Sequence, residues 1–183
     1  IDRLVSQLFL YSKLDLEGVP MEMRPVRLDA FLAGFVEESA PDSRTRGLEL
    51  TAERLAPVTV SADPEQLRRV LSNILENSIK YKNKETGHLR ITLEESGRMT
   101  LADDGPGVPD EALPKLFDVF YRSDPSRKNP AGGSGLGLAI AAKAVQGMGG
   151  TIRACNGPNG GLAVEIILPE EGAGDAEDPD HRG

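Results

Sequence analysis

Four stretches of the chain repeat apolar residues with the spacing of an amphipathic helix. The first covers residues 1–16 and stops before Gly18 and Pro20, a pair that ends helices. The second is expected to begin after an N-cap at Asp29 and to kink or end at Pro41. A lone helix of this kind needs a partner for its apolar stripe, so each should pack against another element.

The third and fourth helical stretches carry clearer start signals. Asp63 is followed by Pro64, the combination of an N-cap and a proline at the first helical position, and the apolar repeat continues to about Tyr81. The fourth stretch covers residues 135–148 and follows a run of glycines.

Short alternating or apolar runs between turn residues predict strands, and Pro25 restricts the first of them to a sheet edge. The late strands follow one another through short turns, and helices and strands are mixed without regular alternation. This order favours an α+β fold, a two-layer α/β sandwich whose mixed, mostly antiparallel sheet carries its helices on one face. The expected strands cover residues 22–28, 48–52, 58–61, 89–93, 99–102, 151–154 and 162–168.

Composition narrows the class of protein. The 183 residues suffice for one domain and a piece of another, and a start at Ile1 rather than Met suggests a fragment. With 39% hydrophobic but only 4% aromatic residues, the core should be aliphatic. No apolar run reaches the roughly 18 residues of a transmembrane helix. A net charge of −8 argues against nucleic-acid binding, and the single Cys155 fits a reducing compartment.

Two amides stand where a helix has no structural need of them. Asn73 and Asn77 are four residues apart and therefore share one face of the third helix, with Lys80 and Tyr81 at its end. Amide oxygens suit Mg²⁺ and its phosphate partners. Taken alone, the pattern favours the plainer interpretation, a solvated polar stripe.

Two glycine-containing motifs follow. Asp103 precedes a turn in which Gly105 and Gly107 allow close backbone approach, although Asp-Gly pairs also mark ordinary turns. The run 132–137 leads into a helix, where backbone N–H groups bind phosphate well; a flexible linker is the alternative. No lysine follows the run as in a Walker loop, and it does not follow a strand as in a dinucleotide fold.

The order and spacing of these segments resemble the ATP-binding catalytic domain of sensor histidine kinases, a member of the GHKL superfamily with the Bergerat fold. The N box matches residues 73–81, the first glycine box 103–107, the F box 116–122 and the second glycine box 132–138. The resemblance covers about residues 20–169. The chain departs from the family at Asp104, where Asn is common, and at Val119, where Pro is common.

The resemblance implies a site for ATP and Mg²⁺. Asp103 would accept a hydrogen bond from the adenine amino group, and Asn77 would bind the metal, with Asn73 assisting directly or through water. Phe117 and Phe120 would anchor the lid of residues 123–131 in the core. Lys80 and Arg122 would contact phosphate, although a solvated lysine and a surface ion pair are the plainer interpretations. The implied catalytic residues are Asn73, Asn77, Lys80 and Arg122, and the implied nucleotide-binding residues are Asn77, Lys80, Tyr81, Asp103, Gly105, Gly107, Gly133, Ser134, Gly135, Leu136 and Gly137.

The resemblance also suggests a division of the chain. Residues 1–18 would be the end of the dimerisation-hairpin helix, 19–169 the catalytic domain and 170–183 a disordered acidic tail. The first helix could instead simply pack on the domain that follows. His88 and His181 are the only histidines and neither has the acidic helical surroundings of a phosphoacceptor, so that helix is expected to be missing.

The implied function is transfer of the γ-phosphoryl group of Mg·ATP to a histidine of the hairpin, for relay to the receiver domain of a response regulator. The expected partners are ATP or ADP, the chain's own hairpin in a homodimer and the response regulator, without nucleic acid. The domain is expected to be cytoplasmic, in a membrane-anchored sensor. Three alternatives remain: a GHKL-type ATPase, a Ser/Thr-directed anti-sigma-factor kinase, and a catalytically inactive nucleotide-sensing or protein-binding module.

Overall fold

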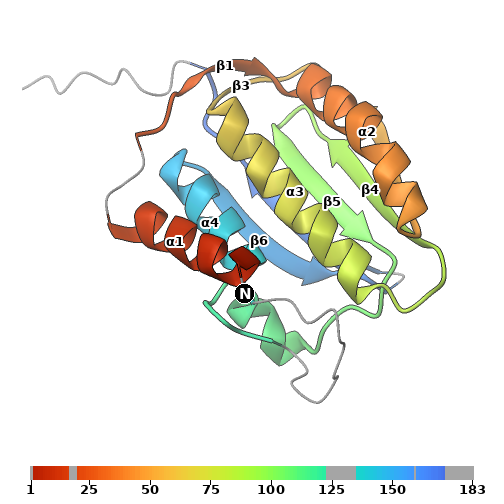
Figure 1. The fold of residues 1–183 in the computed structure, drawn as a ribbon. Helices are drawn as coiled ribbons and strands as arrows, with labels where there is room; N and C mark the ends of the chain where they lie inside the picture. Colours follow the sequence, from red (N-terminus) through yellow and green to blue (C-terminus); the bar gives the residue numbers. More distant parts are fainter. Residues whose placement is uncertain (1, 17–19, 123–134, 159, 172–183) are drawn as a thin grey trace, which may run out of the picture.

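The computed structural model describes residues 2–16, 20–122, 135–158 and 160–171, and Figure 1 shows their arrangement. The helices are α1 (Asp2–Leu16), α2 (Leu28–Thr45), α3 (Pro64–Tyr81) and α4 (Gly137–Gly147), with a short 3₁₀ helix η1 (Asp110–Lys115). The strands are β1 (Arg24–Arg27), β2 (Leu48–Leu55), β3 (Thr59–Ala62), β4 (Gly87–Leu93), β5 (Arg98–Asp103), β6 (Thr151–Asn156) and β7 (Leu162–Ile167).

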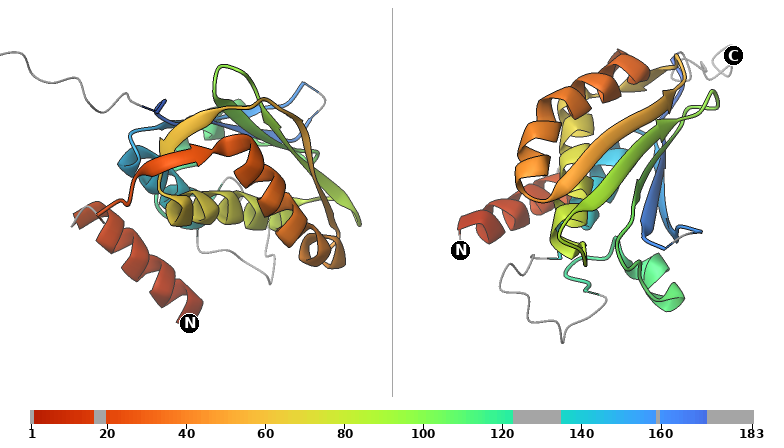
Figure 2. Two further views of the ribbon diagram at one scale, coloured as in Figure 1. Left: turned by 90° about the horizontal axis from the view of Figure 1, so that it is seen from above. Right: turned by 90° about the vertical axis from the view of Figure 1, so that its right-hand side faces the viewer.

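Five strands form one mixed sheet in the order β2-β4-β5-β7-β6. Only β2 and β4 are parallel, and the other neighbours are antiparallel. The edge strand β1, which contains Pro25, pairs antiparallel with β3 in a separate two-stranded sheet. Helices α2, α3 and α4 lie on one face of the five-stranded sheet (Figure 2), so the predicted two-layer sandwich is confirmed.

The layers meet in an aliphatic core. Leu101 of β5 pairs with Ile91 of β4 and with Val164 of β7, and all three side chains are buried. Helix α3 presents Leu67 and Leu71 to the same core. Side chains of these elements therefore exclude water from the centre of the domain, which fixes where α3 and the ends of β5 and β7 lie relative to each other.

The third helix begins as predicted. Oδ1 of Asp63 accepts hydrogen bonds from the backbone N–H groups of Glu65 (3.0 Å) and Gln66 (3.2 Å), and Pro64 occupies the first turn. Oδ2 of Asp63 accepts from the backbone N–H of Glu22 (3.0 Å), which ties the start of α3 to the segment before β1. This cap anchors the helix that carries the candidate site.

The predicted start of α2 was wrong, and the helix continues beyond Pro41. The helix begins at Leu28 rather than after Asp29, because the N–H of Leu28 donates to the carbonyl of Val58 (2.8 Å) and so needs no side-chain cap. Asp29 instead binds the guanidinium of Arg27. Pro41 does not end the helix, which continues one turn further to Thr45, and the kink expected as the alternative stays a prediction.

Helix α1 packs against α4, and much of its apolar surface stays exposed. Arg3 of α1 also forms an ion pair with Glu76 of α3, at 3.7 Å. No helix among residues 2–16, 20–122, 135–158 and 160–171 is long and apolar enough to cross a membrane. The division into hairpin end, catalytic domain and tail stays a prediction, and residues 172–183 lie outside the described part of the chain. Among the described side chains of α1, the large apolar ones that are exposed are Leu4, Val5, Leu8 and Phe9.

Candidate nucleotide-binding site

The carboxylate of Asp103 is held by three hydrogen bonds at the end of β5. Its Oδ1 accepts from the backbone N–H groups of Gly105 and Leu162, both at 3.0 Å. Its Oδ2 accepts from the hydroxyl of Ser78 on α3, at 3.3 Å. A carboxylate has about four acceptor positions, so one stays available on Oδ2. A fixed carboxylate with one open acceptor position suits a ligand that presents an N–H, such as an exocyclic amino group.

The turn after Asp103 needs its glycines because other groups come close. A Cβ on Gly105 would lie 3.1 Å from Oδ1 of Asp103 and 3.7 Å from the carbonyl oxygen of Tyr81. Gly107 has a φ of +67°, and a Cβ there would lie 2.7 Å from Oδ1 of Asn156. The first glycine box thus lies against the end of α3 on one side and the end of β6 on the other.

The two amides of the N box lie near the start of α4. Asn73 and Asn77 are both half-buried on α3, and a Cβ on Gly137 would lie 3.7 Å from Oδ1 of Asn73. Within the described part of the chain, neither amide has a hydrogen-bond partner. Half-buried amides without partners beside a helix N-terminus fit a phosphate group and its cation.

The second glycine box begins the helix only at Gly137. Leu136 is the residue before the first turn, its buried side chain provides no cap, and Gly135 has a φ of +72°. The expected helix start at residue 135 was therefore two residues too early, because left-handed backbone at Gly135 cannot be part of a helix. Gly133 and Ser134, expected phosphate contacts, lie outside the described residues, as does the expected lid of residues 123–131.

The F box and the second glycine box are joined by backbone contacts. The N–H of Phe120 donates to the carbonyl of Gly135 (3.1 Å), and a Cβ on Gly135 would lie 2.9 Å from the backbone of Phe120. Phe117 packs against the core as expected. The core role expected for Phe120 was wrong: its side chain is 55% exposed, because a φ of 61° turns the backbone so that its N–H meets Gly135.

The remaining predicted residues flank this site. The ammonium group of Lys80 lies 4.6 Å from the centre of the Tyr81 ring, a cation–π contact, and the ring is 40% exposed. Arg122 is half-buried at the end of the described segment 20–122. Phosphate contacts by Lys80 and Arg122 stay predictions.

Asp104 has contacts that the sequence did not suggest. Its carboxylate accepts from the ammonium of Lys84 (2.9 Å), the backbone N–H of His88 (2.8 Å) and Nδ1 of His88 (2.9 Å). Burial raises the pKa of Asp104, but these hydrogen bonds outweigh burial and lower it to about 2. His88 is therefore exposed but hydrogen-bonded, and its partner Asp104 belongs to the turn that follows Asp103.

Three further residues of the site were missed: Ser78, Asn156 and Leu162. Ser78 follows Asn77 directly and its buried position on a helix could have been read from the apolar repeat. Asn156 lies two residues after the expected strand 151–154, at the start of the turn, a place where polar side chains often bond to neighbouring backbone. Leu162 contributes only a backbone N–H, for which a sequence carries no signal.

Comparison with known proteins places the chain in one ATPase family. Residues 62–172 match the family described as "Histidine kinase-, DNA gyrase B-, and HSP90-like ATPase". The chain is 36% identical over 178 residues to the signal transduction histidine-protein kinase BaeS of Escherichia coli, covering 93% of this chain and 37% of BaeS. It is 38% identical over 138 residues to the sensor histidine kinase component HK1 of Mycobacterium tuberculosis, covering 74% of this chain and 79% of that protein.

Among solved structures, full-length ShkA in complex with AMPPNP is similar with a TM-score of 0.75 and 26% identity, covering 92% of this chain and 35% of ShkA. The chain thus spans about a third of the length of BaeS and of ShkA. The family match covers more than half of the chain, from Ala62 through both glycine boxes. The chain therefore belongs to the histidine kinase-, DNA gyrase B- and HSP90-like ATPase family, and within it to the ATP-binding domains of sensor histidine kinases.

Proposed function

We propose that this chain binds ATP with Mg²⁺ and transfers the γ-phosphoryl group to a histidine on a dimerisation hairpin, for relay to a response regulator. The observation that carries the proposal is the carboxylate of Asp103, which keeps one acceptor position on Oδ2 while three donors fix its orientation. An adenine amino group is the N–H donor that this position suits. Relatives named as histidine kinases, and a structural neighbour solved with AMPPNP, support the same nucleotide.

The proposed phosphate end lies between α3 and α4. Asn77 would bind Mg²⁺ with one amide oxygen, and Asn73 would hold a phosphate oxygen or a metal-bound water, since Mg²⁺ keeps several waters and takes few protein ligands. The N-terminus of α4 would attract the negative phosphates. When bound, Mg²⁺ supplies charge neutralisation of the phosphates. The task of this chain is then to position the groups and stabilise their charge.

Lys80 and Arg122 would add positive charge near the transferred group. For Lys80 this requires that its ammonium leave the face of Tyr81, a contact worth only about 0.5–1 kcal/mol at an exposed site. A phosphate contact for the ammonium would offset that loss, because charge-assisted hydrogen bonds are stronger.

The residue at position 73 distinguishes kinase from hydrolase. ATPases of this superfamily resemble the chain elsewhere but place a glutamate one helical turn before the metal-binding asparagine, to activate water. Asn73 is one turn before Asn77 and an amide cannot act as a general base. This favours phosphoryl transfer to a protein over hydrolysis.

The exposed apolar face of α1 supports the hairpin as partner. Leu4, Val5, Leu8 and Phe9 are between 46% and 62% exposed, and such a stripe on a helix normally lies against other helices. In the whole protein these would be the other helices of a homodimeric hairpin. The receiver domain of a response regulator and a cytoplasmic position in a membrane-anchored sensor belong to the same proposal.

Titration calorimetry with ADP, with and without Mg²⁺, tests the nucleotide site. We expect binding that Mg²⁺ strengthens. Incubation with γ-labelled ATP and a separately produced hairpin carrying the phosphoacceptor histidine tests transfer, and we expect acid-labile label on the hairpin. Failure of folded protein to bind ADP would overturn the proposal, whereas binding without transfer would favour a nucleotide-sensing module.

A further inference from the structure

The side chain of Asn156 holds the backbone on the far side of the first glycine box. Its Oδ1 accepts from the N–H of Val108 (3.0 Å), and its Nδ2 donates to the carbonyl of Val108 (2.6 Å) and to Oδ1 of Asp110 (3.3 Å). One amide thus supplies both a donor and an acceptor to the same residue, as a neighbouring strand would. Val108 lies in a segment without regular secondary structure, so its backbone conformation depends on this side chain.

The fit between Asn156 and the turn is close. Gly107, the residue before Val108, has a φ of +67°, and any side chain there would meet Oδ1 of Asn156 at 2.7 Å. Left-handed backbone is not otherwise favoured, even for glycine, over the alternatives open to it. The two hydrogen bonds to Val108 therefore select the conformation of Gly107, and with it the direction in which the turn leaves Asp103.

The same β6–β7 connection also holds the other end of the turn. The N–H of Leu162 donates to Oδ1 of Asp103 (3.0 Å), and a Cβ on Gly161 would lie 1.9 Å from the carbonyl oxygen of Asp103. The connection is closed on itself by the N–H of Gly157, which donates to the carbonyl of Gly161 (3.0 Å). Asn156 and Leu162 are thus the two ends of one closed turn that contacts Asp103 and Val108.

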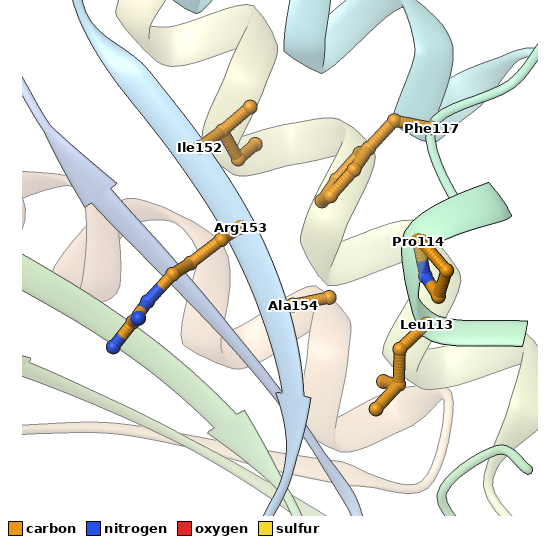
Figure 3. Close-up of a pocket in the computed structure, with 6 residues that line it drawn as sticks. All are labelled: Leu113, Pro114, Phe117, Ile152, Arg153 and Ala154. Carbon is orange, nitrogen blue, oxygen red and sulfur yellow. The ribbon is translucent and has the colours of Figure 1, made fainter. Parts of the chain in front are cut away.

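A purely structural role for Asn156, as the anchor of η1, is less well supported. Figure 3 shows Leu113 and Phe117 facing Ile152 and Ala154 of β6, while Arg153 points away from them. The hollow between these residues has a volume of about 390 Å³. Leu113 and Phe117 also pack against the core of the domain, and η1 lies beside β6, so apolar packing holds η1 as well. Of the three hydrogen bonds of Asn156, the longest reaches η1 at Asp110 (3.3 Å), and the other two hold Val108, the residue that follows the glycine box.

We infer that Asn156 is a positioning residue for nucleotide binding. Through Val108 and Gly107 it fixes the turn that would contact the base, and it keeps this turn in a constant position relative to the carboxylate of Asp103. It touches neither base nor phosphate itself. The inference rests on the proposed function, because it assigns a role within the same nucleotide site. Its consequence is selective, since a loosened turn weakens the grip on the base and leaves the phosphate end, between Asn77 and α4, unchanged.

The test compares Asn156→Ala with Arg153→Ala, a change on the same strand at an exposed side chain that forms an ion pair with Glu165. We expect Asn156→Ala to raise the Kd for ADP and the KM for ATP about 10-fold, with kcat at saturating ATP within about 2-fold of wild type. Arg153→Ala should change none of these. Asn156→Asp retains an acceptor for the N–H of Val108 but lacks the donor, so its Kd should lie at or above the alanine variant's, because its charge also faces Asp110.

The outcomes separate this inference from the proposed function. Wild type that binds no ADP overturns the function. Wild type that binds, with an unchanged Kd in Asn156→Ala, overturns the role of Asn156 alone. A fall in kcat as large as the rise in KM, with a lower Tm, would mean that Asn156 acts only on stability and also overturns it. If Asn156→Ala does not fold, Asn156→Asp decides by the same comparison.

Discussion

The hydroxyl of Ser78 donates to Oδ2 of Asp103 across 3.3 Å, and this contact joins the helix of the two amides to the carboxylate of the base site. Because Oδ1 already accepts from two backbone N–H groups, the Ser78 contact fixes the remaining oxygen. Helix α3 therefore contributes to both ends of the proposed site. It carries the two amides of the phosphate end, and through Ser78 it also orients the carboxylate of the base end. Because Ser78 follows Asn77 directly in the sequence, a shift of α3 would move the contact with Asp103 and the amide of Asn77 together.

Asp103→Asn should weaken ADP binding roughly 10- to 100-fold, because a hydrogen bond to a charged group contributes about 1.5–3 kcal/mol and an amide can also present a donor. Ser78→Ala, which leaves the carboxylate in place, should cost only about 2- to 10-fold. Titration calorimetry of both variants measures the difference. Inorganic phosphate analogues should bind Asp103→Asn as they bind wild type, and equal ADP affinity in Asp103→Asn and wild type would contradict the adenine role.

Asn77→Ala should lower phosphoryl transfer to a supplied hairpin about 100-fold or more, the scale of losing one preorganised group in an active site. Its ADP affinity without Mg²⁺ should change little, because the amide has no partner among the described residues and its loss disturbs no contact there. Quantifying label on the hairpin, beside calorimetry without metal, measures both effects. Unchanged transfer would refute the assignment of Asn77 as the metal ligand.

The two-layer fold could be predicted from the sequence, because the helices and strands that form its layers show local patterns of apolar spacing, caps and turn residues. The cap at Asp63 and Pro64 is a local signal, and it located α3 correctly. The predicted start of α2 was wrong, because the N–H of Leu28 donates to the carbonyl of Val58, thirty residues away along the chain. No local signal reports a hydrogen bond of that kind.

In the candidate site too, residues with a local signal could be predicted, and residues placed by distant contacts could not. Asp103 and the glycines could be found from the motif, because close backbone approach needs glycine and an acceptor that does not donate needs a carboxylate. Phe120 could not be placed, since its exposure follows from a positive φ that a contact with Gly135 imposes. Asn156 lies 48 residues from the backbone that it holds, so only the folded chain shows the connection.

Gly135→Ala should lower the Tm by about 2–8 °C, because left-handed backbone costs a residue with a side chain about 1–2 kcal/mol and its Cβ would meet the backbone of Phe120 at 2.9 Å. Gly34→Ala is the matched control. Gly34 lies inside α2 with no atom within 4 Å of a built Cβ, so this change should raise the Tm. Thermal unfolding followed by circular dichroism measures both, and a neutral Gly135→Ala would mean that the contact with Phe120 is not rigid.

The Asp104 cluster predicts a pH dependence of stability. The pKa of Asp104 is lowered from 3.8 to about 2 in the folded chain, so its contribution is present above about pH 4 and is lost as the pH falls toward 2. Asp104→Asn should therefore lower the Tm by no more than about 4 °C at pH 7, since exposed ion pairs contribute at most about 1 kcal/mol. The difference from wild type should shrink between pH 4 and pH 3. A difference that is independent of pH would mean that the charge of Asp104 does not contribute.

The chain alone, with Mg·ATP, should not become phosphorylated on histidine. His88 lies on strand β4, and its Nδ1 is 2.9 Å from the carboxylate of Asp104. His181 belongs to the expected acidic tail, outside the described residues. Neither has the acidic helical surroundings of a phosphoacceptor. A separate hairpin should accept label slowly, because tethering normally supplies an effective concentration in the millimolar range that is lost here. Incubation with γ-labelled ATP, followed by acid treatment, distinguishes the cases, and acid-labile label on this chain alone would show that one of its two histidines is the phosphoacceptor.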